Sequence, residues 1–321
     1  MQKLLYHYCS LNTFLSIIGN KTIRASDCSK TNDTEETRWI ATMIESVFLE
    51  KINESNKFCL KYNITEEKLN YIKKQITKVI NAVFYQNSRH MTTYTTCFSE
   101  KGDLLSQWRG YADDAKGISI GFDKKILQSF DTGGYNFQFK KVIYKSQEQT
   151  MFIKNYLGEL IESYELVNDE SLTSLDKLFN DFLYDLSLRV LTIRNDSPQF
   201  KNSAFQEERE WRLFVNNHLS NLYCYDHKND EVCAGYVDEN YNKECIYSNG
   251  FIRHQTKFRS SDNRIISYFD LNFVKIKDNL IKEIIIGPKC ETSMFDIQLF
   301  LAANDYSYDE IKIRKSKATY R

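Results

Sequence analysis

Short apolar runs at the beginning of the chain predict a strand, a helix and a second strand. Leu4–Cys9 combines apolar and aromatic residues and is expected to be a strand. Ser10 occupies a favoured N-cap position before Leu11–Ile18, whose apolar residues recur at helical spacing. Gly19-Asn20 is expected to end that helix in a left-handed conformation, and Ile23–Ser26 returns as a strand.

Two longer stretches have the periodicity of helices. In segment 33–88, Asn32-Asp33 begins one helix with acidic residues in its first turn, and Thr65 caps another. We expect these two helices to pair in an antiparallel manner. Segment 147–196 is again helical and predicts a helical insertion before further strands.

The other expected strands are short and rich in β-branched and aromatic residues. They are Thr92–Ser99, Gly117–Phe122, Tyr135–Tyr144, Glu208–Val215, Arg264–Lys277, Ile281–Ile286 and Glu310–Lys315. A short helix capped by Asp103 is expected over Leu104–Tyr111, and a later one over Thr292–Ala303. The pattern predicts an α+β fold with a mixed central β-sheet, packed helices and a helical insertion.

Composition supports one continuous domain over residues 1–321. There are only two prolines and 11 glycines, which leaves little room for a Pro/Gly-rich linker. Lys plus Arg equals Asp plus Glu, at 43 each, which argues against a dedicated non-specific nucleic-acid binder. We see neither an apolar run long enough to span a membrane nor a signal peptide, and expect a cytoplasmic protein.

The eight cysteines are expected to be free thiols, because none forms a C-x2-C pair. A zinc site built from Cys224, Cys233 and Cys245 is the weaker alternative. Motifs for a P-loop, a dinucleotide-binding turn and a zinc protease are absent. Gly117–Gly121 reads G-I-S-I-G, but it lies inside an expected strand and is not a nucleophile elbow.

The first candidate site residue is His7, which lies between Tyr6 and Tyr8 on the first expected strand. Successive strand residues face opposite sides, so His7 is expected to point away from both tyrosines. Histidine suits acid–base and hydrogen-bonding roles, although a lone histidine is more often structural.

The segment Thr96–Asp123 is dense in acidic, basic, amide and aromatic groups and is expected to form one wall of a polar pocket. Ser99 and Glu100 lie at a strand end, where side chains reach a ligand. Arg109 carries a guanidinium suited to carboxylate or phosphate. Trp108 and Tyr111 share a helix face and could stack a flat ring, although a core anchor is the favoured interpretation for Trp108.

The third group is Glu208, Glu210 and Arg212, which share one face if the segment is a strand. Two carboxylates and a guanidinium are costly to bury unpaired. They predict a solvated ladder of charges, a buried ion network or a polar pocket. A network that pairs with Arg109 or Arg24 and a functional site are evenly balanced interpretations.

Six blocks together resemble the bacterial family of domains of unknown function numbered 2971. They are LYHYCSLNTFLSII with GNKTIRAS, NDTEE, CFSEKGDLLSQWRGYADDAKGISIGFD, FQEEREWRL, IKEIIIGP and IKIRKSKATYR. The order of the blocks is that of the family. The resemblance implies no established activity, although some members lie near phage-defence or mobile elements.

The opening strand, helix and second strand are also similar, more distantly, to ADP-ribosyltransferases that modify nucleic acid. That similarity implies that His7, with Tyr8 beside it, holds the ribose of NAD, and that Tyr111 or Trp108 stacks nicotinamide. By the same analogy, Arg24 or Arg109 contacts the pyrophosphate. Glu208 or Glu210 then bonds a ribose hydroxyl and stabilises the oxocarbenium-like transition state.

Three functions follow as expectations. The first is an ADP-ribosyltransferase-like effector that uses NAD, with a nucleic-acid or protein acceptor, in anti-phage defence or as a toxin. The second is a non-catalytic nucleotide-binding sensor or regulatory module of a defence system. The third is a metal-dependent hydrolase or nuclease, which needs clustered acidic ligands. No metal is expected for the first two, and the sequence does not indicate an oligomeric state.

Overall fold

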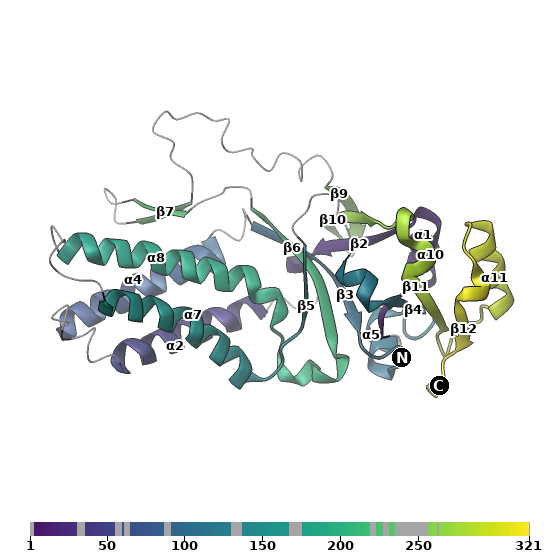
Figure 1. The fold of residues 1–321 in the computed structure, drawn as a ribbon, viewed down its shortest axis with the longest axis horizontal. Helices are drawn as coiled ribbons and strands as arrows, with labels where there is room; N and C mark the ends of the chain where they lie inside the picture. Colours follow the sequence, from purple (N-terminus) through teal and green to yellow (C-terminus); the bar gives the residue numbers. More distant parts are fainter. Residues whose placement is uncertain are drawn as a thin grey trace, which may run out of the picture.

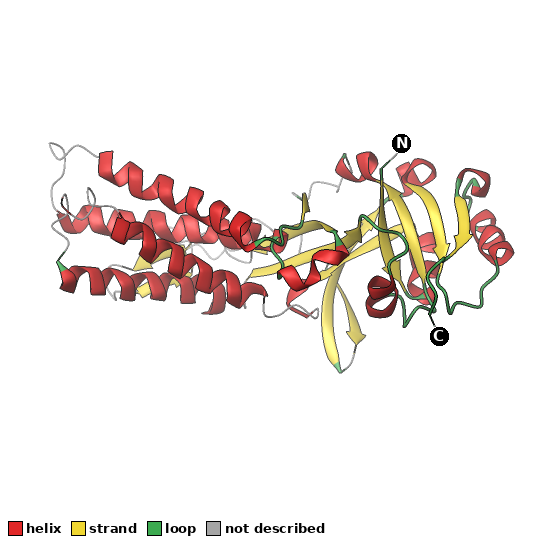
Figure 2. Ribbon diagram, turned by 90° about the horizontal axis from the view of Figure 1, so that it is seen from below, coloured by secondary structure: helices red, strands yellow, loops and turns green. Residues whose placement is uncertain are grey.

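The computed structural model describes the chain in segments. These are residues 3–30, 36–54, 60, 65–86, 91–129, 137–166, 175–218, 223–226, 231–234, 256–261 and 263–320. A bundle of helices and a β-sheet lie end to end along the long axis (Figures 1 and 2). Strand β6 (Glu210–His218) follows the bundle in sequence and enters the sheet.

The described residues form a mixed sheet of ten strands, so the expected α+β class is confirmed. Its path runs β12-β11-β4-β1-β3-β2-β10-β9, and β6 pairs with both β3 and β5. Among these described strands, the β11–β12 pair alone is parallel, and the other pairs are antiparallel. Besides β6, the strands are β1 (Leu4–Cys9), β2 (Thr22–Asp27), β3 (Met91–Ser99), β4 (Ile118–Asp123), β5 (Gln138–Lys141), β9 (Lys257–Ser261), β10 (Arg264–Asn272), β11 (Ile281–Ile286) and β12 (Lys312–Lys315). Strands β7 (Tyr223–Asp226) and β8 (Glu231–Ala234) form a separate pair.

The helices divide between the two ends of the molecule. Those of the bundle are α2 (Glu36–Glu54), α4 (Glu66–Asn81), α7 (Ser146–Leu166) and α8 (Leu175–Asp196). Those around the sheet are α1 (Leu11–Asn20), α5 (Leu105–Tyr111), α6 (Lys124–Gln128), α10 (Lys277–Leu280) and α11 (Met294–Ala303). The expected helical segments 33–88 and 147–196 therefore build the bundle.

Each end of the molecule has its own hydrophobic cluster. Residues such as Phe98, Phe122 and Ile284 pack between the sheet and its helices. Phe48, Leu186 and other residues of the four long helices pack within the bundle. Among the described residues these are the two larger apolar cores, and a smaller cluster that includes Tyr8, Trp108 and Ile285 packs beside the sheet.

The sheet forks at β3. Strand β6 pairs with one edge of β3 along its whole length. The other edge pairs with β1 at Ser99 alone and with β2 at Tyr94 and Thr95. On this edge of β3, residues 96–98 have no strand partner, because β1 and β2 diverge here. We call this point the fork.

Local expectations hold where capping chemistry is strong. The Ser10 and Thr65 side chains accept hydrogen bonds from Thr13 N and Lys68 N, as N-caps do. The expectation for the end of the first helix was wrong. The left-handed residue is Lys21, with φ of 52°, because the helix extends through Asn20.

Most of the expected strands differ from the observed strands in their bounds, and three differ the most. Tyr135–Tyr144 narrows to β5, and Arg264–Lys277 ends as β10 at Asn272 before a short helical turn. Glu208 lies in a 3-10 turn before β6, so that strand begins two residues late. The expected helix start at Asn32-Asp33 lies outside the described residues.

Candidate functional site

The alternation of β1 places its aromatic residues on the two sides of the sheet. Tyr8 packs edge-on against Trp108 of α5 at a centroid distance of 4.9 Å, and Tyr6 lies on the same side. We call this side the α5 face. His7 points to the other side, where its ring lies 6.0 Å from Phe98, as the alternation predicts.

His7 bonds to the strand on the far side of the fork. Its Nδ1 lies 2.9 Å from the carbonyl oxygen of Cys97. Neither β1 nor β2 pairs with Cys97, so this carbonyl has no backbone partner from these two strands. Because a carbonyl only accepts, Nδ1 carries the proton and Nε2 is left as an acceptor. Burial lowers the pKa of His7, although the Cys97 carbonyl acts in the opposite direction, so the ring is neutral.

Four charged side chains meet at the junction between bundle and sheet. We call Lys201, Glu208, Glu210 and Arg212 the junction cluster. Lys201 Nζ lies 2.7 Å from Glu208 Oε2 and 3.2 Å from Glu210 Oε2. Arg212 donates to both oxygens of Glu210, at 2.8 Å from Nε and 3.2 Å from Nη2. All four residues are buried, and their formal charges cancel.

The two glutamates have opposite electrostatic environments. Burial favours the neutral form of Glu210, but Arg212 and Lys201 outweigh it and lower the pKa of Glu210 to about 2. For Glu208, burial dominates over Lys201, so the pKa of this carboxyl is raised. The pKa of Lys201 is also raised, because Glu210 and other partners outweigh the effect of burial.

Glu208 is the glutamate of this cluster that faces an exposed aromatic residue. Tyr111, at the end of α5, is 45% exposed and donates a long hydrogen bond of 3.3 Å to Glu208 Oε1. Ser99 is buried and donates through its hydroxyl to the backbone carbonyl of Glu208 at 2.7 Å. Ser99 at the end of β3 and Tyr111 at the end of α5 therefore both bond to Glu208, the first to its backbone and the second to its carboxylate.

Several residues expected at the site have other partners. Trp108 is fully buried and donates from Nε1 to Asp103 Oδ1 at 2.9 Å, which is the environment of a core anchor. Glu100 accepts from Lys141 at 2.9 Å and from Trp211 Nε1 at 3.0 Å. The expectation that Asp103 caps α5 was wrong. Asp103 instead accepts hydrogen bonds from Trp108 and from the C-terminal segment.

The expected arginines lie away from the junction cluster. Arg24 is 3.7 Å from Asp270 and lies over the ring of Tyr268. Arg109 is exposed and lies 5.9 Å from the ring centroid of Tyr320. The expectation that either arginine neutralises the glutamates was wrong, because Lys201 takes this role with Arg212.

Sequence reasoning missed Lys201, and also Tyr144, whose hydroxyl accepts from Glu210 N at 2.8 Å. Lys201 follows the buried Phe200 in an irregular stretch that connects two 3-10 turns. No periodicity marks it as buried. The one usable signal was the pair of glutamates itself, since two buried carboxylates near one arginine require a second cation.

Within the part of the chain that the structure describes, no group of three or more His, Cys, Asp or Glu side chains is suited to a metal ion. Cys224 and Cys233 are paired in the backbone register of β7 and β8, whereas Cys245 lies outside the described residues. The same part of the chain holds no helix with the length and apolar character needed to cross a membrane.

Comparison with known proteins gives one result. No curated protein and no solved structure matches the chain. A family model described as protein of unknown function (DUF2971) matches residues 107–213. This stretch runs from α5 to β6 and includes Tyr111 and the whole junction cluster. The chain therefore resembles the DUF2971 family in the segment that builds the candidate site.

Proposed function

We propose that the chain is an ADP-ribosyltransferase-like enzyme that transfers ADP-ribose from NAD, with Glu208 as its principal carboxylate. The observation that carries the proposal is that Tyr111 and Ser99 both donate hydrogen bonds to Glu208, the first to its carboxylate and the second to its backbone carbonyl. His7 points to the opposite side of the sheet, so we give it no part in the transfer. Strand, helix and turn thus supply a serine, an aromatic ring and a glutamate from three distant parts of the sequence.

Glu208 suits the role better than Glu210. Both oxygens of Glu210 are held by Arg212, and one also by Lys201, so this carboxylate has little capacity for a further donor. Within the described part of the chain, Oε1 of Glu208 accepts only the long hydrogen bond from Tyr111. A ribose hydroxyl that displaced the Tyr111 hydroxyl would meet an acceptor already oriented by Lys201.

Transfer of ADP-ribose requires a fixed negative charge in the site. When the bond between ribose and nicotinamide breaks, its electron pair leaves with nicotinamide and positive charge develops on the ribose. A carboxylate held in a water-poor site stabilises that charge without reorganisation. Tyr111, at the edge of the site, is placed to stack on a flat ring. The role in defence or as a toxin remains a prediction from family resemblance.

The test is release of nicotinamide from NAD, with and without nucleic-acid and protein acceptors. Glu208→Gln keeps the shape of the side chain and should abolish release, because it removes the negative charge. Glu207→Gln is a matched control on the exposed neighbouring residue and should retain activity. An absence of turnover with every acceptor, by a protein that is folded, would refute the proposal.

A second candidate is a non-catalytic nucleotide-binding module. The saturated contacts of Glu210, Arg212 and Lys201 favour it, because a fully paired network orients a surface without supplying free catalytic groups. It predicts that NAD raises the unfolding temperature without product. Glu208→Gln would then weaken binding and leave no reaction to lose.

A further inference from the structure

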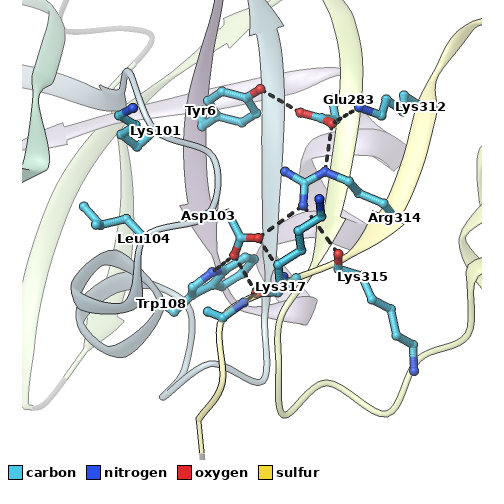
Figure 3. A network of polar contacts seen from close by, with 12 residues as sticks. Tyr6, Lys101, Asp103, Leu104, Trp108, Glu283, Lys312, Arg314, Lys315 and Lys317 are labelled. Carbon is cyan, nitrogen blue, oxygen red and sulfur yellow. Dashed lines mark hydrogen bonds and ion pairs between the residues drawn. The ribbon is translucent and has the colours of Figure 1, made fainter.

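A second polar network lies on the α5 face (Figure 3). The strand register places it on the other side of Tyr6 from Glu210 of the junction cluster. Its centre is Glu283 of β11. The Tyr6 hydroxyl donates to Glu283 Oε2 at 2.6 Å, and Oε1 accepts from Arg314 Nε at 3.0 Å. Lys312 Nζ lies 3.1 Å from the same Oε1. These partners lower the pKa of Glu283 despite its burial, so it stays ionised.

Asp103 is the second acid of this network. It accepts from Trp108 Nε1 at 2.9 Å, from the backbone N of Lys317 at 2.8 Å and from the hydroxyl of Ser316. Arg314 Nη1 also donates to it, at 3.2 Å. Both carboxylates are therefore fully engaged, and together they hold the guanidinium of Arg314 in one orientation.

The two carboxylates do not pair with every donor group of the cations in this network. Among the described residues, Arg314 Nη2 and the ammonium of Lys317 have no acceptor. The Lys317 side chain extends alongside Arg314, whereas that of Lys315 points away (Figure 3). Lys312, Arg314 and Lys317 oppose only Glu283 and Asp103, so one positive charge remains.

The local sequence shows the same imbalance. Residues 312–321 contain five basic residues and no acidic one, although the whole chain has a formal net charge of zero. A purely structural clamp would explain the bonds of Asp103 to the C-terminal segment. It would not require a guanidinium edge and an ammonium side by side without an acceptor.

We propose that Arg314 and Lys317 bind the phosphate group of a small soluble phosphate ester or diphosphate. A guanidinium that is already oriented loses little entropy on binding, and its planar edge suits two phosphate oxygens. Lys317 adds a mobile point charge. The inference does not depend on the proposed transfer reaction.

Titration calorimetry with inorganic pyrophosphate tests the site directly. The intact chain should bind pyrophosphate, with an affinity that falls as NaCl is raised. Lys317→Gln should weaken binding about tenfold, as expected for one charge-assisted hydrogen bond. Arg314→Lys keeps the charge but loses the fork, and should weaken binding comparably while thermal unfolding shows a folded protein.

Lys315→Gln is the matched control, because it removes the same charge from a side chain that points away from the site. It should leave binding within about twofold of the unmodified chain, since distant exposed charges are screened. Equal losses in Lys315→Gln and Lys317→Gln would overturn the proposal. So would a chain that binds a single-stranded oligonucleotide but not pyrophosphate, or one that binds neither.

Discussion

Two glutamates only two positions apart show how strongly placement governs an ionisable group. Glu210, inside β6, has a pKa lowered to about 2 by Arg212 and Lys201 against the effect of burial. Glu208, in the preceding turn, has a raised pKa because burial outweighs its one strong partner. The first residue is suited to structural pairing and the second to contact with a ligand.

Glu210 should make the stability of the chain depend on acid pH. Its folded pKa of about 2 lies below the ordinary 4.5, so its contribution is complete above pH 4.5 and is lost as pH falls towards 2. The contribution is on the order of 3 kcal/mol. Urea unfolding at several pH values in this window should show a steeper loss for the natural chain than for Glu210→Gln. Parallel curves would contradict the assignment.

Gly102 should be intolerant of a side chain. A Cβ there would overlap the Tyr6 ring, which is fixed by its bond to Glu283. We expect Gly102→Ala to lower the free energy of unfolding by about 1–3 kcal/mol. Gly110→Ala is the control, because its Cβ would meet nothing within 4 Å. That change, in a helix, should be neutral or stabilising by up to about 1 kcal/mol. Denaturant unfolding of both variants checks the contrast.

At the scale of elements, the fork at β3 determines what His7 does. A continuous pairing of β1 with β3 would satisfy the Cys97 carbonyl through the backbone. Because the pairing stops at Tyr6 and Ser99, a side chain must do so, and His7 does. The fork thus explains why a histidine is found on an otherwise apolar and aromatic strand.

Replacement of His7 should show how much its hydrogen bond to Cys97 contributes to stability. His7→Ala removes the donor to Cys97 O and should cost about 1–3 kcal/mol of stability. His7→Asn supplies an amide NH2 near the position of Nδ1 and should recover part of this loss. Chemical denaturation of the two variants gives the comparison, and equal stabilities would contradict the role assigned to Nδ1.

The sequence predicts elements well where local chemistry decides them. Ser10 and Thr65 cap helices, and Ile281–Ile286 is the strand that its apolar run predicts. The site was predictable only in part. Glu210 and Arg212 share a face because strand alternation requires it, but Lys201 enters from an irregular segment without periodicity. Asp103 resembles a helix cap in sequence, and its partners on the C-terminal segment are visible only in the fold.

For the whole molecule, the junction cluster connects two separately packed cores. Phe200 belongs to the bundle core, and the next residue, Lys201, pairs with Glu208 and Glu210 before and within β6. The N-terminal turn of α7 joins the same place, since Gln149 donates to Lys201 O at 3.0 Å. Buried ion pairs are weak stabilisers but costly to break, so the cluster specifies how bundle and sheet meet.

Lys201→Met should therefore destabilise the chain far more than loss of a surface lysine. It leaves two buried carboxylates with Arg212 as their remaining cation in the cluster, at a cost of about 3–5 kcal/mol. Lys154→Met breaks an exposed pair with Glu50 and should have little measurable effect. Calorimetric unfolding of both variants tests the contrast, and similar shifts in Tm would exclude the special role of Lys201.

The order of strands in the sheet also has a kinetic consequence. Strands β1 and β2 pair with segments that follow much later in the chain: Tyr6 with Gly121, and Ala25 with Phe269. Chains with such distant pairings fold slowly, because the loop must close before any contact stabilises it. Strands β1 and β2 therefore leave the ribosome with unsatisfied edges, and we expect a nascent chain that depends on chaperones until β10 has emerged.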